Sequence, residues 1–326
     1  MLENPSFLRN RPNMSDPLSD MLTLVEARSI LSGRLHAGGA WAVWFPPPER
    51  IKFSALLCGT CWLSMQGLHK PVRLEAGDVI VVNGQRSFML ASDPTLNPVD
   101  ARALFREAPD NVARIGSSED VFLFGGHVAI NAARGGLVMD VLPPLIHVRS
   151  ATPEAGALRW LLEQLVAELS SSQPGSHLAA SHLAQLMFVQ VLRAHLADAA
   201  QSPNAGWIRA LSDDRIAPAL RLMHSEPSRA WTLGELAQAS AMSRTTFAAR
   251  FKNVAGVAPV AYLLGWRMRL AERALLNSDA PISSVALSVG YTSESAFSNA
   301  FKRIVGVSPK RYRSARMPMS KEQPLS

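Results

Sequence analysis

The C-terminal third of the chain contains one sequence pattern twice, and this internal repeat restricts the possible folds more than any other feature. Residues of the same type recur 50 positions apart in the two copies. The matching pairs are Phe247 and Phe297, Phe251 and Phe301, Gly256 and Gly306, Pro259 and Pro309, and Tyr262 and Tyr312. Agreement over such a frame predicts two copies of one compact helical unit.

Each copy has the residue pattern of a helix-turn-helix. In the first copy a short apolar helix precedes a turn at 241–243, and Ser243 can cap the next helix by accepting a hydrogen bond from its free amides. Phe247 and Phe251, four residues apart, bury one face of that second helix. In the second copy Gly290, which has no Cβ, permits the sharp turn. The sequence therefore predicts two helix-turn-helix units.

Small polar and basic side chains lie off the phenylalanine faces of the second helices, and they suit the base edges and phosphates of a DNA major groove. The residues expected to contact DNA are Arg244, Thr245, Thr246 and Arg250 in the first copy, and Ser293, Ser295, Ser298, Asn299, Lys302 and Arg303 in the second. Lys310 and Arg311 are expected nearer to phosphates, and the role of Glu294 stays open. A helical bundle that binds proteins, with the phenylalanines as plain core, is the alternative.

A connecting helix is predicted over 260–276, after Pro259, which stands where no amide donor is needed. Its apolar stripe consists of Leu264, Met268, Ala271 and Leu275. Some 17 residues at about 1.5 Å each make a rod of roughly 25 Å. A rod of that order can hold two recognition helices in successive major-groove windows, which recur every ~34 Å.

The positive charge of the chain is concentrated in the repeat region. The whole sequence has 33 Lys and Arg against 26 Asp and Glu, a formal net charge of +7. From Arg229 to the end there are 14 Lys and Arg against 5 Asp and Glu, which leaves 19 against 21 upstream. A basic block beside a near-neutral body is typical of a nucleic-acid-binding domain joined to another domain. On charge alone, a solvated basic face is the alternative.

The segment from about Asp214 to Tyr312 resembles the DNA-binding domain of the AraC/XylS family of bacterial transcription regulators. The most specific match is the second copy, VALSVGYTSESAFSNAFKRIVGVSPKRYR, at 285–313. The resemblance implies an all-α domain with two helix-turn-helix units that binds double-stranded promoter or operator DNA. It also implies an activator that contacts RNA polymerase, and an upstream domain that senses a small-molecule effector and forms a homodimer.

The residues upstream of the repeat predict strands followed by helices. Short apolar runs bounded by glycines indicate strands of a sandwich or barrel, at 41–45, 53–57, 62–65, 79–82, 121–124 and 137–142. Apolar residues three and four apart indicate amphipathic helices over 154–169 and 177–197. The predicted fold is a multidomain α+β chain, with an N-terminal β-barrel and its following helices before a C-terminal all-α double helix-turn-helix domain.

The upstream region resembles a cupin, on the segment FSALLCGTCWLSM and on LEAGDVIVVNGQRSF at 74–88. Many cupins are metalloenzymes, so a metal-dependent cupin enzyme fused to a DNA-binding tail is the alternative function. A cupin metal site needs a His-x-His pair, which the chain lacks, and the expected position of the last ligand holds Phe88. No ligand spacing relates the histidines of this region, His36, His69, His127 and His147. We therefore expect no metal, no cofactor and no catalytic residues.

Cys58 and Cys61 are the two cysteines of the chain and form a C-x-x-C motif. Residues three apart on a straight strand point to opposite faces, which opposes a disulfide, whereas a tight turn at Gly59 and Thr60 would bring the thiols together. A zinc site would need a second pair of ligands, which is missing. A redox-sensing pair and simple packing inside the barrel both stay open.

Two further expectations concern the upstream region. The rings expected either to line an effector pocket or to fill the barrel core are Trp41, Trp44, Phe53, Trp62 and Phe88. The apolar stripe expected to form a dimer seam, or else to pack against the sheet, is Leu183, Leu186, Met187, Val191 and Leu192.

The predicted organisation is a flexible arm over 1–20, a sensor domain over 21–205 with its helical dimerisation or packing segment, a linker over 206–213, a DNA-binding domain over 214–315 and a flexible tail over 316–326. No apolar run approaches the ~18 to 20 residues of a membrane helix, and no apolar segment of a secretory signal is present. Two cysteines form no disulfide framework, which fits a cytoplasmic protein. A ligand-independent architectural DNA-binding protein is a further alternative.

Overall fold

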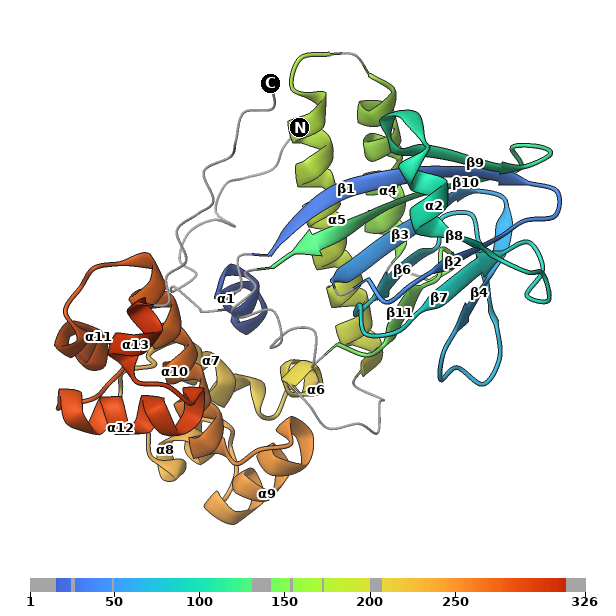
Figure 1. Ribbon diagram of the computed structural model, residues 1–326. Helices are drawn as coiled ribbons and strands as arrows, with labels where there is room; N and C mark the ends of the chain where they lie inside the picture. Colours follow the sequence, from blue (N-terminus) through green and yellow to red (C-terminus); the bar gives the residue numbers. More distant parts are fainter. Residues whose placement is uncertain are drawn as a thin grey trace, which may run out of the picture. The chain divides into compact units, whose positions relative to one another are not determined.

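The computed structural model describes residues 16–24, 27–48, 50–130, 142–152, 155–171, 173–199 and 207–314. The chain divides into two compact units (Figure 1). One unit spans residues 25–202 and contains all the described strands. The other combines residues 1–24 with residues 203–326, and its described elements are helices. The predicted α+β class, with a sheet-rich domain before an all-helical one, is confirmed.

The larger sheet of the strand-rich unit has six strands in the order β11-β6-β3-β10-β1-β9. Its strands are β1 (Arg28–Gly38), β3 (Ile51–Cys58), β6 (Val79–Val82), β9 (Val112–Gly116), β10 (Val121–Ala129) and β11 (Leu145–Val148). Neighbouring strands are antiparallel except for β1 and β9, which run parallel. Residues far apart in the sequence therefore meet at the centre of this sheet, where β3 and β1 flank β10.

The smaller sheet has five strands in the order β5-β4-β7-β2-β8. Its strands are β2 (Ala42–Phe45), β4 (Thr60–Met65), β5 (Val72–Glu75), β7 (Phe88–Ala91) and β8 (Val99–Asp100). Helix α2 (Ala101–Arg106) follows β8 directly, and the Asp100 carboxylate caps it by accepting a hydrogen bond from the Arg102 amide at 2.7 Å. A single 3-10 turn, η2 (Pro109–Asn111), leads into β9.

Apolar side chains from both sheets form one buried core. Leu123 on the larger sheet and Leu90 on the smaller one belong to the same cluster. Trp41 and Phe88 belong to it as well, at 3% and 2% exposure. Side chains alternate between the two faces of a strand, so every second residue of β2, β4 and β7, together with Val121 and Leu123 of β10, contributes to this layer. Trp41 and Phe88 are therefore core rings, in agreement with the second of their two predicted roles.

Asp78, from the segment that resembles a cupin, ties three parts of the barrel together. Its carboxylate accepts hydrogen bonds from the Ser150 amide at 2.7 Å and the Glu75 amide at 3.1 Å, and it lies 2.8 Å from Nε2 of His147. Burial alone would raise the pKa of Asp78, but these hydrogen bonds and the nearby His147 hold it below its usual value. A buried carboxylate with these partners stays ionised and is structural.

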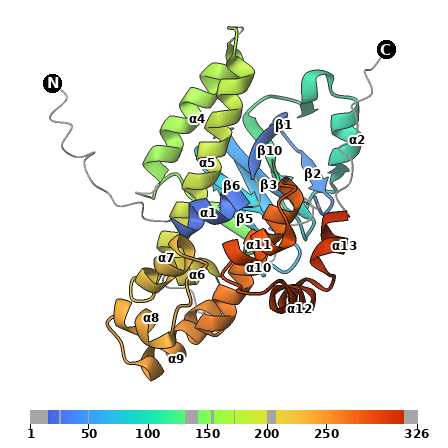
Figure 2. The same ribbon diagram turned by 90° about the vertical axis from the view of Figure 1, so that its left-hand side faces the viewer.

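Helices α4 (Ala155–Ser170) and α5 (Ser176–Ala199) pack on each other, and α5 also packs on β1 and β11 (Figure 2). Met187, Val191 and Leu192 are buried within this unit, whereas Leu186 is 42% exposed. The predicted apolar stripe thus mostly packs against the sheet and α4. This is the second of the two roles that were predicted for it. It is not a free dimer seam.

The strand predictions succeed where apolar runs are dense. The runs at 41–45, 53–57, 62–65, 79–82 and 121–124 fall on β2, β3, β4, β6 and β10. The longest strand, β1, escaped prediction because its sequence RSILSGRLHAG mixes charged, polar and small residues, and its register shifts between Leu31 and Gly33. Most of the run at 137–142 lies outside the described residues.

The helical unit contains the helices of both predicted helix-turn-helix units and the predicted connecting helix, and its described helices after the barrel are eight in number. They are α6 (Trp207–Ser212), α7 (Ala217–Ser225), α8 (Leu233–Ala239), α9 (Arg244–Ala255), α10 (Pro259–Asn277), α11 (Ile282–Ser288), α12 (Glu294–Val305) and α13 (Pro309–Ser314). Helix α10 is the predicted connecting helix. Its stripe residues Met268, Ala271 and Leu275 are buried, so the periodicity identified the face that packs.

Two separate apolar cores, one for each copy of the repeat, support these helices. In the first core Phe251 lies between Phe247 and Tyr262, with ring centroids 5.6 Å from each. The three residues at the same positions plus 50 repeat this arrangement, with separations of 5.6 and 5.4 Å. The matching frame in the sequence is therefore a matching pair of cores.

Helix α1 (Pro17–Leu24) precedes the barrel in the sequence but belongs to the helical unit. Its residues Leu18, Met21 and Leu24 are buried, and the helix contacts α7 and α10. The predicted flexible arm over 1–20 therefore does not apply to residues 17–20, because this short segment has an apolar face that packs. In the same way α6 occupies most of the predicted linker over 206–213.

A polar chain fixes α1 in place. Nδ1 of the buried His224 lies 3.1 Å from the Asp20 carboxylate, and Nε2 lies 2.8 Å from the Tyr262 hydroxyl. The imidazole also stacks on Trp266 at 4.1 Å. The rest of the predicted arm and the predicted tail over 316–326 lie outside the described residues. Within the part of the chain that the structure describes, no helix has the length and apolar character needed to cross a membrane.

Candidate nucleic-acid interface

Helices α9 and α12 begin and end in the same way. Each has a serine at its N-cap, Ser243 or Ser293, whose hydroxyl accepts a hydrogen bond from the amide three residues later, at 3.2 and 3.1 Å respectively. Each ends at a glycine in the left-handed conformation, Gly256 with φ of 79° and Gly306 with φ of 88°. These are standard start and stop signals, and they fix two helices of equal length in equivalent positions of the repeat.

The turns that precede the two helices differ. In the first unit Ala241 has a φ of 50°, and Ser243 caps the next helix two residues later. In the second unit Gly290 has a φ of 86°, and the cap Ser293 follows three residues later. A Cβ on Gly290 would come within 2.3 Å of the Ser228 carbonyl oxygen, so only glycine fits there. The sharp turn predicted at Gly290 is confirmed.

The first turn of α9 presents predicted contact residues to the surface. Arg244, Thr245 and Thr246 are exposed, and the Thr246 hydroxyl lies 2.8 Å from that of Ser243. The Arg244 guanidinium lies close to Gly234 of α8, where an added Cβ would stand 3.1 Å from Nε. The beginning of α9 is thus an open polar edge.

Arg250 differs from the other predicted contact residues. Its Nε and Nη2 donate hydrogen bonds to the two carboxylate oxygens of Asp213, at 3.2 and 2.7 Å. The Asp213 side chain is only 10% exposed, and that of Arg250 is 37% exposed. The same carboxylate accepts hydrogen bonds from the amides of Arg215 and Ile216. This bidentate pair fastens α9 to the segment that follows α6, so Arg250 has a structural partner that the sequence did not reveal.

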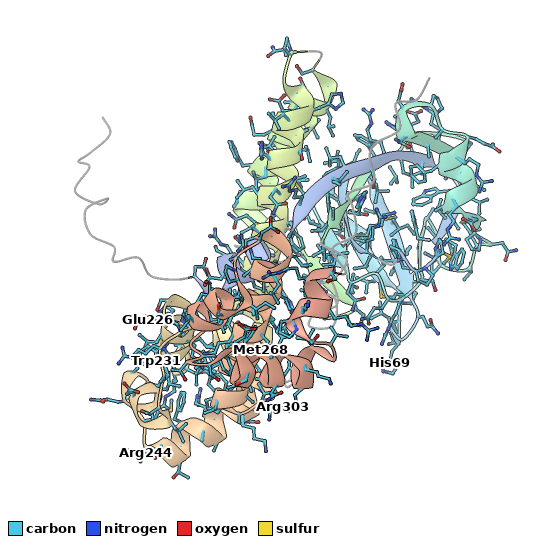
Figure 3. All side chains as sticks on the ribbon, turned by 60° about the vertical axis from the view of Figure 1, so that its left-hand side comes forward. His69, Glu226, Trp231, Arg244, Met268 and Arg303 are labelled. Atoms are coloured by element: carbon cyan, nitrogen blue, oxygen red, sulfur yellow. The ribbon has the colours of Figure 1, made fainter. Side chains whose placement is uncertain are left out.

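Helix α12 carries a larger exposed polar face. Ser293, Ser295, Asn299, Lys302 and Arg303 are exposed, and Ser298 is half-buried. No ion pair within the described ranges involves Lys302 or Arg303. Figure 3 labels Arg244 and Arg303 on the outside of the helical unit and Met268 in its interior. The predicted contact residues therefore lie on the surface on both helices, with Arg250 engaged within the fold.

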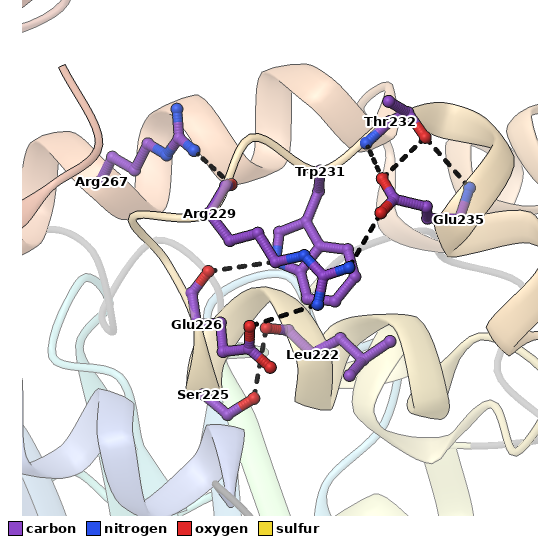
Figure 4. Close-up of polar contacts among 8 residues, drawn as sticks. All are labelled: Leu222, Ser225, Glu226, Arg229, Trp231, Thr232, Glu235 and Arg267. Carbon is purple, nitrogen blue, oxygen red and sulfur yellow. Dashed lines mark hydrogen bonds and ion pairs between the residues drawn. The ribbon is translucent and has the colours of Figure 1, made fainter. Parts of the chain in front are cut away.

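A charged brace supports the start of α8 and was not predicted. Thr232 and Glu235 form a reciprocal capping box, in which the Glu235 carboxylate accepts from the Thr232 amide at 2.8 Å and the Glu235 amide donates to the Thr232 hydroxyl at 3.2 Å. Arg229 joins Glu235 at 2.9 Å and Glu226 at 3.3 Å, and its guanidinium stacks over Trp231 at 3.9 Å (Figure 4). These contacts hold the loop before the first helix-turn-helix.

The brace changes the acidity of its central carboxyl group. The hydrogen bonds from the Thr232 amide and hydroxyl, followed by the one from Arg229, lower the pKa of Glu235 to about 2. Arg267 of α10 holds the same loop from the other side by donating to the carbonyl oxygens of Pro227 and Arg229, at 2.6 and 2.7 Å. The Thr-x-x-Glu spacing was the available sequence signal for the capping box.

Comparisons with known proteins agree with these two units. Residues 16–197 match the cupin family model, and residues 236–315 match the model of a helix-turn-helix domain. A putative AraC-like transcription regulator of Streptomyces lividans is 45% identical over 91% of this chain and 98% of its own length. The chain belongs to the AraC family of transcription regulators. A second AraC-like relative, from Streptomyces antibioticus, is also 45% identical and is covered over its whole length.

As a member of the AraC family with a cupin domain and a helix-turn-helix domain, the chain is a DNA-binding transcription regulator. Among solved structures, the DNA-binding domain of AdpA in complex with a target DNA is 33% identical over 32% of this chain and 93% of that chain, with a TM-score of 0.30. The helix-turn-helix match over residues 236–315 and the two AraC-like relatives confirm the AraC/XylS resemblance carried by residues 285–313.

The two cysteines of this AraC-family chain lie in different surroundings. Both thiols are free, with Cys58 exposed and Cys61 buried. Burial, together with the negative charge of Asp78, raises the pKa of Cys61 to about 12. Gly59 adopts the left-handed conformation of a tight turn, with φ of 79°. Since the thiolate is the reactive form, burial and the raised pKa disfavour reaction at Cys61, and Cys58 is the accessible thiol.

The histidines of the barrel have partners other than a metal ion. His36 lies 3.3 Å from Glu119, and His147 pairs with Asp78. Across the described ranges, no three His, Cys, Asp or Glu side chains gather in a group that could hold a metal ion.

The cavities of the barrel differ from the predicted pocket. Trp41, Phe53 and Phe88 are at most 3% exposed and line none of the cavities described here, while Trp44 lies at the surface. One cavity, of about 700 Å³, is lined by residues that include Cys58, Phe122 and Arg159. Two others adjoin Lys52 on β3. Of the two roles predicted for these rings, filling the interior therefore applies to Trp41, Phe53 and Phe88, and ring type alone did not reveal which face of a strand each side chain occupies.

Proposed function

We propose that this regulator binds one operator with α9 and α12 in successive major grooves, and that a signal received by the barrel changes that binding. The single observation behind the proposal is the matched pair of helices with exposed polar first turns. Two helices with the same caps, joined through α10, present equivalent edges to a duplex. Exposed Asn, Ser, Lys and Arg side chains of α12 supply groups that recognise base edges and phosphates.

Arg244, Thr245 and Thr246 are the proposed DNA contacts of the first unit. Ser293, Ser295, Asn299, Lys302 and Arg303 are those of the second, with Ser298 at the edge of the surface. Arg250 contributes by holding α9 against the Asp213 segment, so its effect on DNA is indirect. The first unit then carries fewer direct contacts than the second.

The barrel is the proposed sensor, through a small molecule or a redox signal. A small-molecule signal has the stronger support, because the barrel holds cavities while Cys61 is buried with a raised pKa. The chain passes between the two units at 24–25 and again at 202–203, and α1 docks on the helical unit through His224. A change in the barrel can bias the presentation of the DNA-binding helices through either connection.

Further parts of the proposal follow from the DNA partner and the family. The regulator acts as an activator that contacts RNA polymerase, works in the cytoplasm beside its DNA, and catalyses no reaction. It acts as a homodimer, since two-fold operators pair with protein dimers. Exposed apolar residues on α4 and α5, namely Trp160, Leu178 and Leu186, offer a surface for that contact. Sedimentation of the full chain tests the dimer directly.

Titration of DNA with variants of the full chain tests the interface. The DNA is the intergenic sequence upstream of the chain's own gene, at fixed salt, against a scrambled competitor. Asn299→Ala should reduce affinity for the specific DNA by about 1–3 kcal/mol and reduce discrimination against the competitor, because a base contact is lost. Lys302→Ala should weaken binding to both DNAs and lower the salt slope by about 1, because a phosphate contact is lost.

Lys70→Ala is the matched control, since it removes an exposed positive charge from the strand-rich unit. It should leave both titrations unchanged. If Asn299→Ala and Lys302→Ala behave like Lys70→Ala, α12 does not contact DNA and the proposed interface is wrong.

A further inference from the structure

A single lysine points into the strand-rich unit. Lys52 lies on β3, on the same strand face as Ser54 and Leu56, because side chains two residues apart share a face. Leu56 belongs to the core between the two sheets, so the Lys52 chain enters that layer. Its ammonium stands 4.2 Å above the Phe45 ring and 5.9 Å from that of Phe88. A half-buried cation is thus held by two aromatic faces.

Two cavities meet at this lysine. The inner one, of about 70 Å³, is lined by apolar residues that include Leu35 and Leu123, together with Ser54. The outer one, of about 330 Å³, is open and is lined by the three prolines at 46–48 and by Arg102. Phe45, Lys52 and Phe105 line both. The volume of the outer cavity is at the lower end of the range for small-ligand sites.

Among the described residues, the charged groups around Lys52 are basic. Nε2 of His127, opposite Lys52 on β10, accepts a 3.3 Å hydrogen bond from Arg50, and Arg102 on α2 lines the outer cavity. Burial, then Arg50 and Lys52, lower the pKa of His127, which therefore favours the neutral form. Of the described residues that line either cavity, none is an Asp or a Glu, and the Asp100 carboxylate is occupied in capping α2. No carboxylate in the described part of the chain is paired with Lys52.

We propose that the two cavities at Lys52 form a binding site for a small carboxylate with an apolar body, whose charged group pairs with the Lys52 ammonium while its body lies along Phe45, Phe105 and the prolines at 46–48. The proposal rests on the proposed sensing function and gives the effector a chemical class. A half-buried cation that no carboxylate of the described ranges pairs with supplies one strong contact to an anion, and aromatic and proline surfaces supply the rest by apolar burial. A neutral ligand would lack that charged contact.

Burial also gives the site a pH dependence. Desolvation lowers the pKa of Lys52 from 10.5 to about 8. The lysine is therefore mostly charged below that pH and neutral above it, whereas a simple carboxylate stays ionised throughout. A bound carboxylate raises the pKa of Lys52 again, because it stabilises the charged form. Affinity for a carboxylate should accordingly be constant below about pH 8 and fall by about tenfold per unit above it.

Calorimetric titration of the full chain tests the site, with benzoate and octanoate as probes and benzyl alcohol and 1-octanol as their uncharged counterparts. For the unaltered chain, at least one carboxylate should bind about tenfold or more tightly than its alcohol. Lys52→Met should remove that preference and the fall in affinity above pH 8, since it keeps the length of the side chain without its charge. Lys70→Met, at an exposed lysine, should bind as the unaltered chain does.

Equal binding of acids and alcohols to the unaltered chain, or no binding of either acid at millimolar concentration, would overturn the site without any need for a variant. Unchanged carboxylate affinity in Lys52→Met would also overturn it. The DNA titration above, repeated with benzoate or octanoate, separates this site from the sensing role. Carboxylate binding that depends on Lys52 but leaves DNA affinity unchanged supports the site and contradicts the sensor, whereas specific DNA binding without carboxylate binding contradicts the site alone.

Discussion

The two helix-turn-helix units share an apolar frame but differ in their polar residues. Fifty positions after Arg244 stands Glu294, after Ala249 stands Asn299, and after Arg250 stands Ala300. In the first unit two arginines form ion pairs within the fold. Arg250 pairs with Asp213, and Arg229 pairs with two glutamates. The second unit leaves Lys302 and Arg303 at the surface of α12. A repeat in the core can therefore support one braced unit and one unit with more side chains open to DNA.

The largest losses of stability should be of the same size in both units, because the two apolar cores have the same arrangement of rings. Phe251→Ala and Phe301→Ala each remove a fully buried ring and should reduce the free energy of unfolding of their own core by about 3–5 kcal/mol. Native-state hydrogen exchange measures this locally, since amides of α9 should lose protection in the first variant and those of α12 in the second. Loss of protection in both helices from either variant would mean that the two cores unfold together, and the comparison of separate units would fail.

Substitutions in the two turns should give the next largest difference in stability between the units. Gly290→Ala places a Cβ in a left-handed conformation and within 2.3 Å of the Ser228 carbonyl oxygen. We expect a loss of stability of about 3 kcal/mol, from the backbone conformation and the overlap together. Ala241→Gly relaxes the φ of 50° in the first unit and should increase stability by about 0.5 kcal/mol, after the greater freedom of glycine in the unfolded chain is subtracted.

Denaturant unfolding of the full chain, followed with the same exchange probes, measures both turn variants. A stable Gly290→Ala protein would show that the loop carrying Ser228 moves away freely. A destabilised Ala241→Gly protein would show that the shorter turn of the first unit is not strained.

The Arg250 pair tests whether the first unit acts on DNA directly. Arg250→Ala and Asp213→Ala should each cost about 2 kcal/mol of stability, because each leaves a charged partner without its bidentate hydrogen bonds. If Arg250 acts only through Asp213, Asp213→Ala should weaken DNA binding at least as much as Arg250→Ala, because it also removes the hydrogen bonds from the Arg215 and Ile216 amides, and the double variant should be no worse than Asp213→Ala. A loss confined to Arg250→Ala would place this arginine on the DNA, as the sequence suggested.

The sequence predicted what depends on periodicity and local conformation. Phenylalanines four apart, the capping Ser243 and the turn at Gly290 are local signals, so the helices and turns of both units could be predicted from the sequence. The bond between Arg250 and Asp213 joins residues 37 apart, and no spacing rule signals it. An exposed basic residue on a recognition helix therefore looked the same in the sequence whether it was free or paired.

In the barrel, too, contacts between residues far apart in the sequence could not be predicted. Dense apolar runs located five strands, but β1 lacks such a run, and the interior face of β3 was unknown without the register of its neighbours β6 and β10. Trp41 and Phe88, two of the rings predicted to line a pocket or fill the core, belong to the core, while two of the cavities adjoin Lys52. One signal was present, since a lone lysine within the apolar segment IKFSALLC is costly unless it has a role. Its direction follows only from its alternation with Leu56, which the structure places in the core.

The smallest expected difference between the two units is in their stability at low pH. The hydrogen bonds of the Thr232 capping box and of Arg229 lower the pKa of Glu235 from 4.5 to about 2. A carboxyl group with a depressed pKa stabilises the fold above its unfolded value, and this stabilisation is lost as the pH falls from 4.5 towards 2. Helix α11 has Pro281 at its N-cap and no side-chain cap, so it has no corresponding contribution to lose. Protection of α8 amides should therefore fall relative to that of α11 within this window.

Hydrogen exchange of both helices in one sample cancels the pH dependence of the intrinsic exchange rate. Glu235→Gln removes the titrating carboxylate and should make the ratio of α8 to α11 protection independent of pH, with lower α8 protection near neutrality because the bond to Arg229 is weaker. Glu294→Gln is the matched control, since it removes the first-turn carboxylate of α12 and leaves the brace intact. If the unaltered chain already shows a constant ratio from pH 4.5 to about 2, the exposed brace adds nothing to stability, and the first unit is held by Arg250 and its core alone.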